Sequence, residues 1–172
     1  TSDAAPPGPA VLLPWRGISL SSAEWGEKLP FPGVYGKDYE YPSVASTAYY
    51  QAQGMNLMRI AFRWERLQPR LNAEFDAAEL ARLRKFVDGS TARGLHVLLD
   101  PHNYAAYQEQ RIGTPTVPVA AFADFWRRLA LQFKDNPRVL FGLVNEPHGL
   151  STETWADAAQ AAQLFQMLRA FA

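Results

Sequence analysis

The sequence predicts an α/β fold of the (β/α)-barrel type, and three observations lead to that class. Apolar segments of strand length recur along the chain, and most of them end in a cluster of polar side chains. Segments with helical periodicity separate these apolar segments. Arg59 and His102 are 43 positions apart, and so are His102 and Asn145. This equal spacing indicates repeated βα units, in which crossovers join parallel strands.

The composition limits the classes of partner. Seventeen basic residues balance seventeen acidic ones, so no net field favours nucleic acid or an anionic membrane surface. Cysteine is absent, which excludes disulfides and thiolate metal sites. No apolar run approaches the roughly 20 residues that span a bilayer. His96 and His148 lack the spacing of metal ligands, so we expect no metal, cofactor, nucleic acid or membrane partner.

We expect two parts in the chain, a Pro-rich lead over residues 1–15 and one domain over residues 16–172. The lead has neither the basic nor the hydrophobic region of an intact signal peptide. Its composition is typical of the mature end left after signal removal, or of a linker scar. We expect the protein to be secreted.

Four strands and four helices are expected in alternation. The strands are residues 16–20, 56–62, 95–99 and 139–144, and the helices are residues 43–53, 76–93, 120–134 and 152–172. Ser43 is the candidate N-cap of the first helix, and Gly54 takes its C′ position. A polar and aromatic loop, residues 21–42, precedes that helix.

The helix at 76–93 carries the strongest local signals. Asp76 is its candidate N-cap, and Glu79 falls at the capping-box spacing. Phe75 and Leu80 occupy the two ends of a hydrophobic staple. These residues predict where the helix begins, and Gly94 predicts where it ends.

The segment 139–144 is apolar apart from one Gly, and it stops abruptly at Asn145, Glu146 and Pro147. Its composition predicts a strand buried on both faces, as in parallel sheets. Catalytic groups collect at the C-terminal ends of such strands, because the following loop leaves their side chains open to a ligand. A carboxylate that ends a buried strand is costly to desolvate, which makes Glu146 the strongest catalytic candidate.

The number of βα units differs from that of a closed barrel. No Gly-rich phosphate motif follows the first strand, which argues against a dinucleotide-binding sheet. A closed (β/α)8 barrel has eight units in about 250 residues, whereas these 172 residues hold four. The expected architecture is therefore half of a (β/α)8 barrel, which a second chain could complete.

Four segments carry a resemblance to a known family. They are Gly17–Gly26, Met58–Phe62, Asp100–Tyr104 and Phe141–His148. In this order and at strand ends, they resemble the first four strand ends of glycoside hydrolase family 5, especially its endo-β-1,4-glucanases. The resemblance extends from about residue 16 to residue 160. It implies a (β/α)8 barrel that hydrolyses β-glucans with retention of configuration.

The resemblance also implies roles for single residues. Glu146 matches the general acid/base, and Asn145 matches the amide that binds the 2-hydroxyl of the sugar. Arg59 and His102 match polar groups around that sugar. Retaining hydrolysis needs an acid to protonate the leaving oxygen and a second carboxylate, about 5 to 5.5 Å away, to attack the anomeric carbon.

Aromatic side chains near the strand ends are candidate stacking platforms for glucose rings. The candidates are Trp25, Trp64, Tyr104 and Tyr107. Trp25 and Tyr104 are preferred, because they follow strand ends. The expected substrate-binding residues are therefore Trp25, Arg59, His102, Tyr104 and Asn145.

The second carboxylate is not apparent. The family carries it on the seventh strand, and Glu153 and Asp157 fall early in a helix, where acids favour the helix dipole. Glu24 and Glu65 follow the first two strands and could reach the same face, but the resemblance gives neither of them this role. We therefore expect the chain alone to hydrolyse cellulose derivatives weakly or not at all.

Three explanations of the half-barrel stay open. The chain is a fragment of a larger enzyme, two copies close one barrel across a symmetric interface, or the core is covered in another way. A non-catalytic carbohydrate-binding or self-assembling module is the alternative from another functional class. Within the enzyme class, mannan or xyloglucan specificity also stays open.

Overall fold

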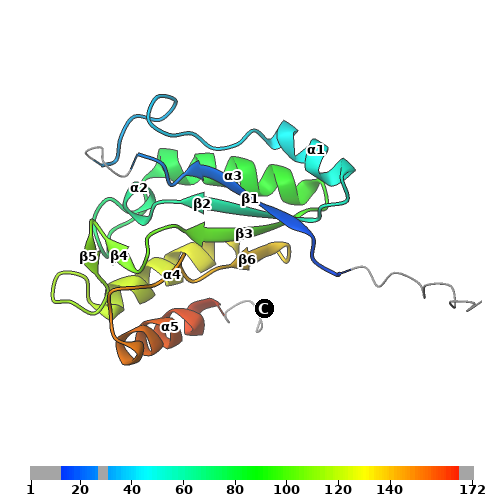
Figure 1. Ribbon diagram of the computed structural model, residues 1–172. Helices are drawn as coiled ribbons and strands as arrows, with labels where there is room; N and C mark the ends of the chain where they lie inside the picture. Colours follow the sequence, from blue (N-terminus) through cyan, green and yellow to red (C-terminus); the bar gives the residue numbers. More distant parts are fainter. Residues whose placement is uncertain (1–12, 27–30, 167–172) are drawn as a thin grey trace, which may run out of the picture.

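The computed structural model describes residues 13–26 and 31–166 (Figure 1). The strands are β1 (Gly17–Ala23), β2 (Leu57–Phe62), β3 (His96–Pro101), β4 (Ala106–Tyr107), β5 (Gln110–Arg111) and β6 (Val139–Phe141). The helices are the 3-10 turn η1 (Val44–Ser46), α1 (Thr47–Ala52), α2 (Trp64–Leu67), α3 (Ala77–Ala92), α4 (Val119–Phe133) and α5 (Thr152–Gln166). Most of the expected lead, and the expected helical residues 167–172, lie outside the described residues.

Four strands form one parallel sheet in the order β1-β2-β3-β6. Neighbouring strands are joined through helices, which confirms the predicted βα units. The registers align Ser19 with Arg59, Arg59 with Leu98, and Leu98 with Leu140. Because parallel strands end at the same edge of a sheet, the polar residues that follow them are brought together there.

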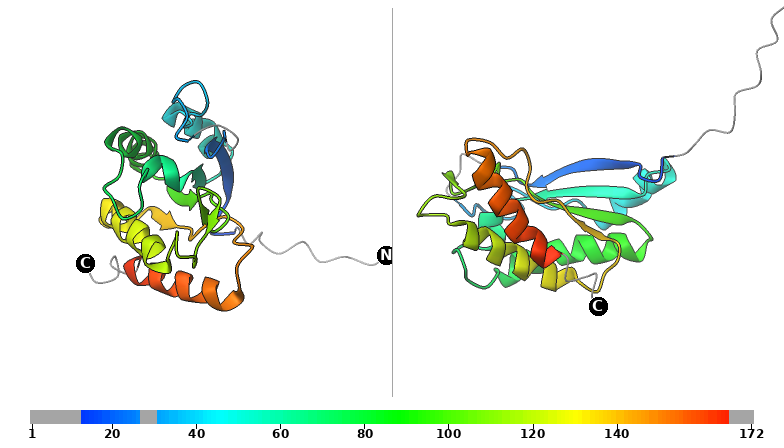
Figure 2. Two further views of the ribbon diagram at one scale, coloured as in Figure 1. Left: turned by 90° about the vertical axis from the view of Figure 1, so that its left-hand side faces the viewer. Right: turned by 90° about the horizontal axis from the view of Figure 1, so that it is seen from below.

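The helices cover one face of the sheet (Figure 2). Side chains alternate along a strand, and those that face the helices, such as Met58 and Ile60, are fully buried. The other face, which we call the open face, carries Leu57, Leu98 and Leu140, and these three are only half-buried. Among the described residues, no helix lies over the open face. None of the helices described is both long and apolar enough to cross a membrane.

The predicted capping box of α3 is half wrong. Asp76 caps the helix as expected, because its carboxylate accepts a hydrogen bond from the Glu79 N–H at 2.8 Å. The Glu79 carboxylate, however, accepts hydrogen bonds from the hydroxyls of Tyr39 at 2.8 Å and Tyr41 at 2.9 Å. The Asp76 N–H donates instead to the Leu67 carbonyl at 2.9 Å. Two tyrosines distant in sequence thus replace the local partner of Glu79.

Two boundaries near the N-terminal end shift from their expected positions. β1 extends to Ala23, so the loop expected from residue 21 begins later. The helix expected at 43–53 begins as η1, where the Ser43 side chain accepts a hydrogen bond from the Ser46 N–H at 3.1 Å. The chain then continues into α1, and Gly54 follows with a φ of 81°.

The strand expected at 139–144 is shorter and more exposed than predicted. β6 pairs with β3 only from Val139 to Phe141, and residues 140–145 are half-buried. The prediction of burial on both faces is wrong, because β6 is the last strand of the sheet and its inner side belongs to the open face. In the described part of the chain, no strand pairs with its outer edge.

Candidate active site

Arg59 lies at the centre of a polar network at the C-terminal edge of the sheet. One of its terminal nitrogens donates to Ser19 Oγ on β1 at 2.9 Å. The other is 2.7 Å from Asp100 Oδ2 on β3 and donates to Asn145 Oδ1 at 2.6 Å. The planar guanidinium presents several donors in fixed directions. It therefore joins β1, β2, β3 and the segment after β6.

His102 is held at both of its ring nitrogens. Nδ1 lies 2.8 Å from Asp100 Oδ2, and Nε2 lies 3.1 Å from the Tyr104 hydroxyl. Asp100 is 3% exposed. Because its Oδ2 contacts both His102 and Arg59, it holds both side chains in place. Asp100 has no predicted role, although the period of two along a strand places it on the same face as Arg59.

Glu146 follows this network in the chain but is exposed rather than buried. Its carbonyl oxygen lies 2.9 Å from His148 Nδ1. The expectation of a desolvated carboxylate is wrong, because β6 ends at Phe141 and a stretch of loop leads from there to Glu146. The Glu146 carboxylate is therefore accessible to a ligand above the strand ends.

Strained backbone gathers at the same edge of the sheet. The φ angles of Tyr104, Ala105 and Glu146 are 52°, 58° and 39°. Such left-handed conformations cost about 1 to 3 kcal/mol each for residues other than Gly, and they cluster at active sites and ligand clamps. The Tyr104 and His148 ring centroids are 5.6 Å apart, so the two strained segments are in contact.

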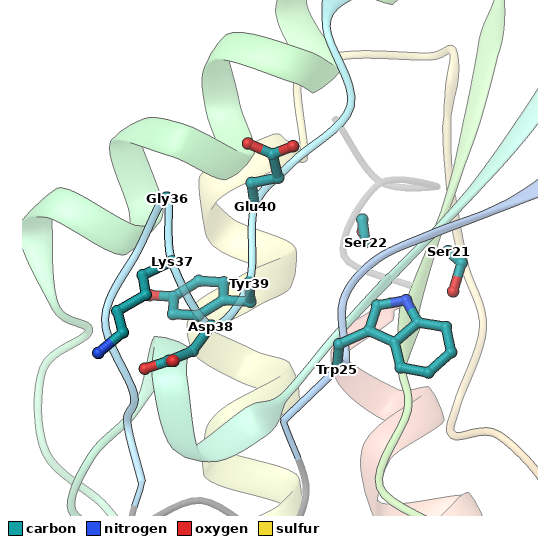
Figure 3. A pocket seen from close by; sticks show the side chains of 8 residues that line it. All are labelled: Ser21, Ser22, Trp25, Gly36, Lys37, Asp38, Tyr39 and Glu40. Carbon is teal, nitrogen blue, oxygen red and sulfur yellow. The ribbon is translucent and has the colours of Figure 1, made fainter.

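A cavity of about 360 Å³ opens beside the network. Its lining includes Ser19, Glu24, Trp25, His102 and Tyr104. Trp25 is 62% exposed and also borders a second cavity of about 380 Å³. Figure 3 shows Ser21, Ser22 and Trp25 on one side of the second cavity and residues 36–40 on the other. Both preferred aromatic residues, Trp25 and Tyr104, thus line one cavity together with His102.

The other two stacking candidates belong to the core. Trp64 is 1% exposed and Tyr107 is 5% exposed, and their ring centroids are 4.9 Å apart. The Tyr107 hydroxyl donates to the Gln68 carbonyl at 2.8 Å, and burial, together with nearby Glu65, raises its pKa to about 12. Both rings are therefore core residues and are not available to stack on a sugar, in keeping with the preference for Trp25 and Tyr104.

The two carboxylates considered as substitutes for the nucleophile already accept hydrogen bonds from other groups of the protein. Glu24 accepts hydrogen bonds from the Ser21 hydroxyl and, at 2.5 Å, from the Ser22 N–H. Glu65 accepts hydrogen bonds from Asn103 Nδ2 at 2.7 Å and from the Gln108 N–H at 2.6 Å. Within the described residues, no group of three or more His, Asp or Glu side chains is placed to hold a metal ion.

Comparisons with known proteins agree with this arrangement. Endoglucanase 3 of Humicola insolens is 42% identical over 149 residues, which cover 86% of this chain and 37% of that protein. An endo-β-1,4-glucanase of Xanthomonas axonopodis pv. citri superposes with a TM-score of 0.87 at 42% identity, over 92% of this chain and 50% of that one. XacCel5A in complex with cellopentaose gives a TM-score of 0.87 at 44% identity, over 91% of this chain and 50% of that one.

The chain therefore spans half or less of the length of these relatives. Its parallel four-stranded sheet with alternating helices corresponds to half of a (β/α)8 barrel, as predicted. The family model described as cellulase, glycosyl hydrolase family 5, matches residues 7–172. With almost the whole chain matched and four strand ends in the expected order, this protein belongs to the cellulase family, glycosyl hydrolase family 5.

Proposed function

We propose that this chain forms the acid/base half of a site that hydrolyses β-1,4-glucan with retention of configuration. The observation that carries the proposal is the hydrogen-bonded network of Arg59, Asp100, His102 and Asn145. Asn145 directly precedes Glu146 in the chain, and His102 lines a cavity together with the exposed Trp25. The relatives named as endoglucanases, and the relative bound to cellopentaose, support a glucan substrate.

Each residue has a role that its contacts allow. Because Asn145 Oδ1 accepts a hydrogen bond from Arg59, its Nδ2 is oriented to donate to a sugar 2-hydroxyl. Such a bond strengthens as the ring gains oxocarbenium character. Glu146 would protonate the leaving oxygen and then deprotonate the incoming water. Trp25 and Tyr104 would stack on glucose rings, and His102, held by Asp100, would bind hydroxyls.

The proposal includes weak or absent hydrolysis by the chain alone. Retention requires a nucleophilic carboxylate about 5 to 5.5 Å from the acid. Glu24 accepts hydrogen bonds from the end of β1, and Glu65 accepts them from the segment after β3, which makes each of them a poor nucleophile. A complementing chain or a longer protein would supply the missing group.

A reducing-sugar assay on carboxymethyl cellulose tests this assignment, beside the matched variant Glu146→Gln. We expect the purified 172-residue chain to give little or no product. A robust rate that Glu146→Gln abolishes would show that the chain holds its own nucleophile. A robust rate that survives the substitution would remove Glu146 from the acid/base role.

Binding without cleavage is the second candidate function. The engagement of Glu24 and Glu65 favours it, since the other parts of a sugar-binding site are present. Calorimetry with cello-oligosaccharides, run beside the reducing-sugar assay, separates the two candidates. A measurable Kd without turnover supports a carbohydrate-binding or self-assembling half-barrel.

Three further features belong to the same proposal. The protein would be secreted, since insoluble and polymeric glucans are met outside the cell. A second copy or a complementing chain would cover the open face and the free edge of β6. Mannan and xyloglucan are alternative substrates to be included in the assay.

A further inference from the structure

Arg66 is a buried cation outside the polar network around Arg59. It lies on α2 and is 2% exposed, and burial lowers the pKa of its guanidinium. A buried charge costs several kcal/mol unless its donors are satisfied in good geometry. The groups that accept its hydrogen bonds therefore indicate which part of the structure Arg66 stabilises.

All three guanidinium nitrogens of Arg66 donate to backbone carbonyls, one in the last residue of β1 and two beyond it. Nη1 donates to the Ala23 carbonyl, Nη2 to the Trp25 carbonyl at 2.5 Å, and Nε to the Pro32 carbonyl at 2.9 Å. The side chain of Trp25 is 62% exposed, so the position of the indole depends strongly on the backbone that carries it. Arg66 fixes that backbone at Trp25 itself.

A second layer of side chains holds Arg66. Its guanidinium carbon is 3.8 Å from the centre of the Tyr39 ring, a favourable contact between a cation and an aromatic face. Tyr39 and Tyr41 both donate to Glu79, which is 2% exposed. Burial and the Glu79 carboxylate raise the pKa of both tyrosines above the ordinary value, so both remain protonated donors. The contacts run unbroken from the first turn of α3 to Trp25.

We propose that Arg66 is a positioning residue for Trp25 and thereby sets the affinity of the site for a β-1,4-linked glucan chain. The inference rests on the proposed function, in which Trp25 stacks on a glucose ring. Stacking on a glucose ring requires an indole that is held at a fixed height and tilt. If the loop that carries the indole had to be ordered on binding, the site would bind the ligand more weakly. Tyr39 and Glu79 act one step further from the ligand, by holding Arg66.

A double-mutant cycle on the 172-residue chain tests the inference, with cellopentaose as the probe and calorimetry as the measurement. Arg66→Lys keeps the charge but replaces the planar fork with a point charge, which cannot reach three carbonyls at once. We expect Arg66→Lys and Trp25→Ala each to raise Kd roughly three- to tenfold, the scale of one aromatic contact. The double variant should bind no more weakly than Trp25→Ala, because the two residues act as one unit.

Arg84→Lys is the matched control. Arg84 also lies over an aromatic ring, that of Phe133, and donates to a backbone carbonyl, that of Gln132 at 3.1 Å. It lies on α3, away from Trp25, and its substitution should leave Kd unchanged. If Arg66→Lys weakens binding no more than Arg84→Lys, or if the losses in the double variant multiply, Arg66 does not act through Trp25 and the inference is overturned.

Two other outcomes separate this inference from the proposed function. If Trp25→Ala leaves Kd unchanged, the stacking platform itself is wrong. If the unsubstituted chain fails to bind cellopentaose, the proposed recognition fails and the inference fails with it.

Should circular dichroism show that Arg66→Lys is unfolded, Tyr39→Phe takes its place, since it keeps the ring and removes only the hydroxyl bonded to Glu79. A smaller rise in Kd, absent in the Trp25→Ala background, supports the inference, and no rise overturns it.

Discussion

Asp100 is the residue on which the polar network depends most directly. Its Oδ2 meets the Arg59 guanidinium at 2.7 Å and His102 Nδ1 at 2.8 Å. The carboxylate is almost fully buried, while the Arg59 side chain keeps 29% of its surface exposed. If Asp100 were neutralised, solvent could still hydrogen-bond to the exposed part of the Arg59 guanidinium. The buried oxygens of Asp100, in contrast, have partners only within the protein.

Asp100→Asn is expected to lower the free energy of unfolding by about 1 to 3 kcal/mol, because it removes one charge of a largely buried pair. Urea denaturation monitored by circular dichroism measures the change. The control is Asp135→Asn, which breaks an ion pair with Lys134 whose side chains are 79% and 40% exposed. That change should cost less than about 1 kcal/mol. Equal losses in both variants would contradict a structural role for Asp100.

At the scale of elements, α4 is fastened to the segment before α3 by a small ion network. Asp124 on α4 accepts hydrogen bonds from Arg127 and Arg128, each at 2.7 Å. Arg128 also pairs with Glu74 and donates to the Asn72 carbonyl at 3.1 Å. Burial raises the pKa of Asp124, but the hydrogen bonds from Arg128 and Arg127 outweigh it and hold that pKa below its ordinary value.

This lowered pKa predicts how the stability of the chain depends on pH. A carboxylate whose pKa is lower in the folded state stabilises the fold above its unfolded pKa, and the stabilisation is lost as the pH falls through the folded pKa. We therefore expect Asp124→Asn to be destabilised relative to the unsubstituted chain at pH 7, by about 1 kcal/mol or less. The difference should shrink as the pH falls below the ordinary value of 3.8. Urea titrations at several pH values measure it, and a difference that grows toward acid pH would contradict the assignment.

At the scale of the whole molecule, the chain leaves one face of its sheet and the edge of β6 uncovered within the described residues. Leu57, Leu98 and Leu140 are half-buried on the open face. Parallel sheets are normally covered on both faces, and a free edge offers unpaired backbone groups to another chain. The same leucines would form part of a barrel interior if a second set of strands closed the sheet.

We expect the isolated chain to associate through this face, so that its solution mass exceeds 19.2 kDa. Leu98→Lys should shift the mass toward the monomer, since it places a charge in the centre of the open face. Leu131→Lys is the matched control, because Leu131 is 42% exposed on α4, on the opposite side of the sheet. Sedimentation velocity over a range of concentrations decides the question. A 19.2 kDa monomer for the unsubstituted chain would rule out the homodimeric barrel.

The sequence by itself determined the alternation of strands and helices, the start of α3 at Asp76, and the set of polar residues at the C-terminal edge of the sheet. These depend on periodicity, caps and short spacings, which act between residues close together in the chain. Only the tertiary structure decided that Trp64 and Tyr107 are buried and that Glu146 is exposed. It also decided that the Glu79 side chain bonds to Tyr39 and Tyr41 rather than to the Asp76 N–H. Those outcomes depend on contacts between distant residues, as with Arg59 and Asn145, 86 positions apart. Local patterns cannot specify such contacts, because they arise only when packing brings separate strands and helices together.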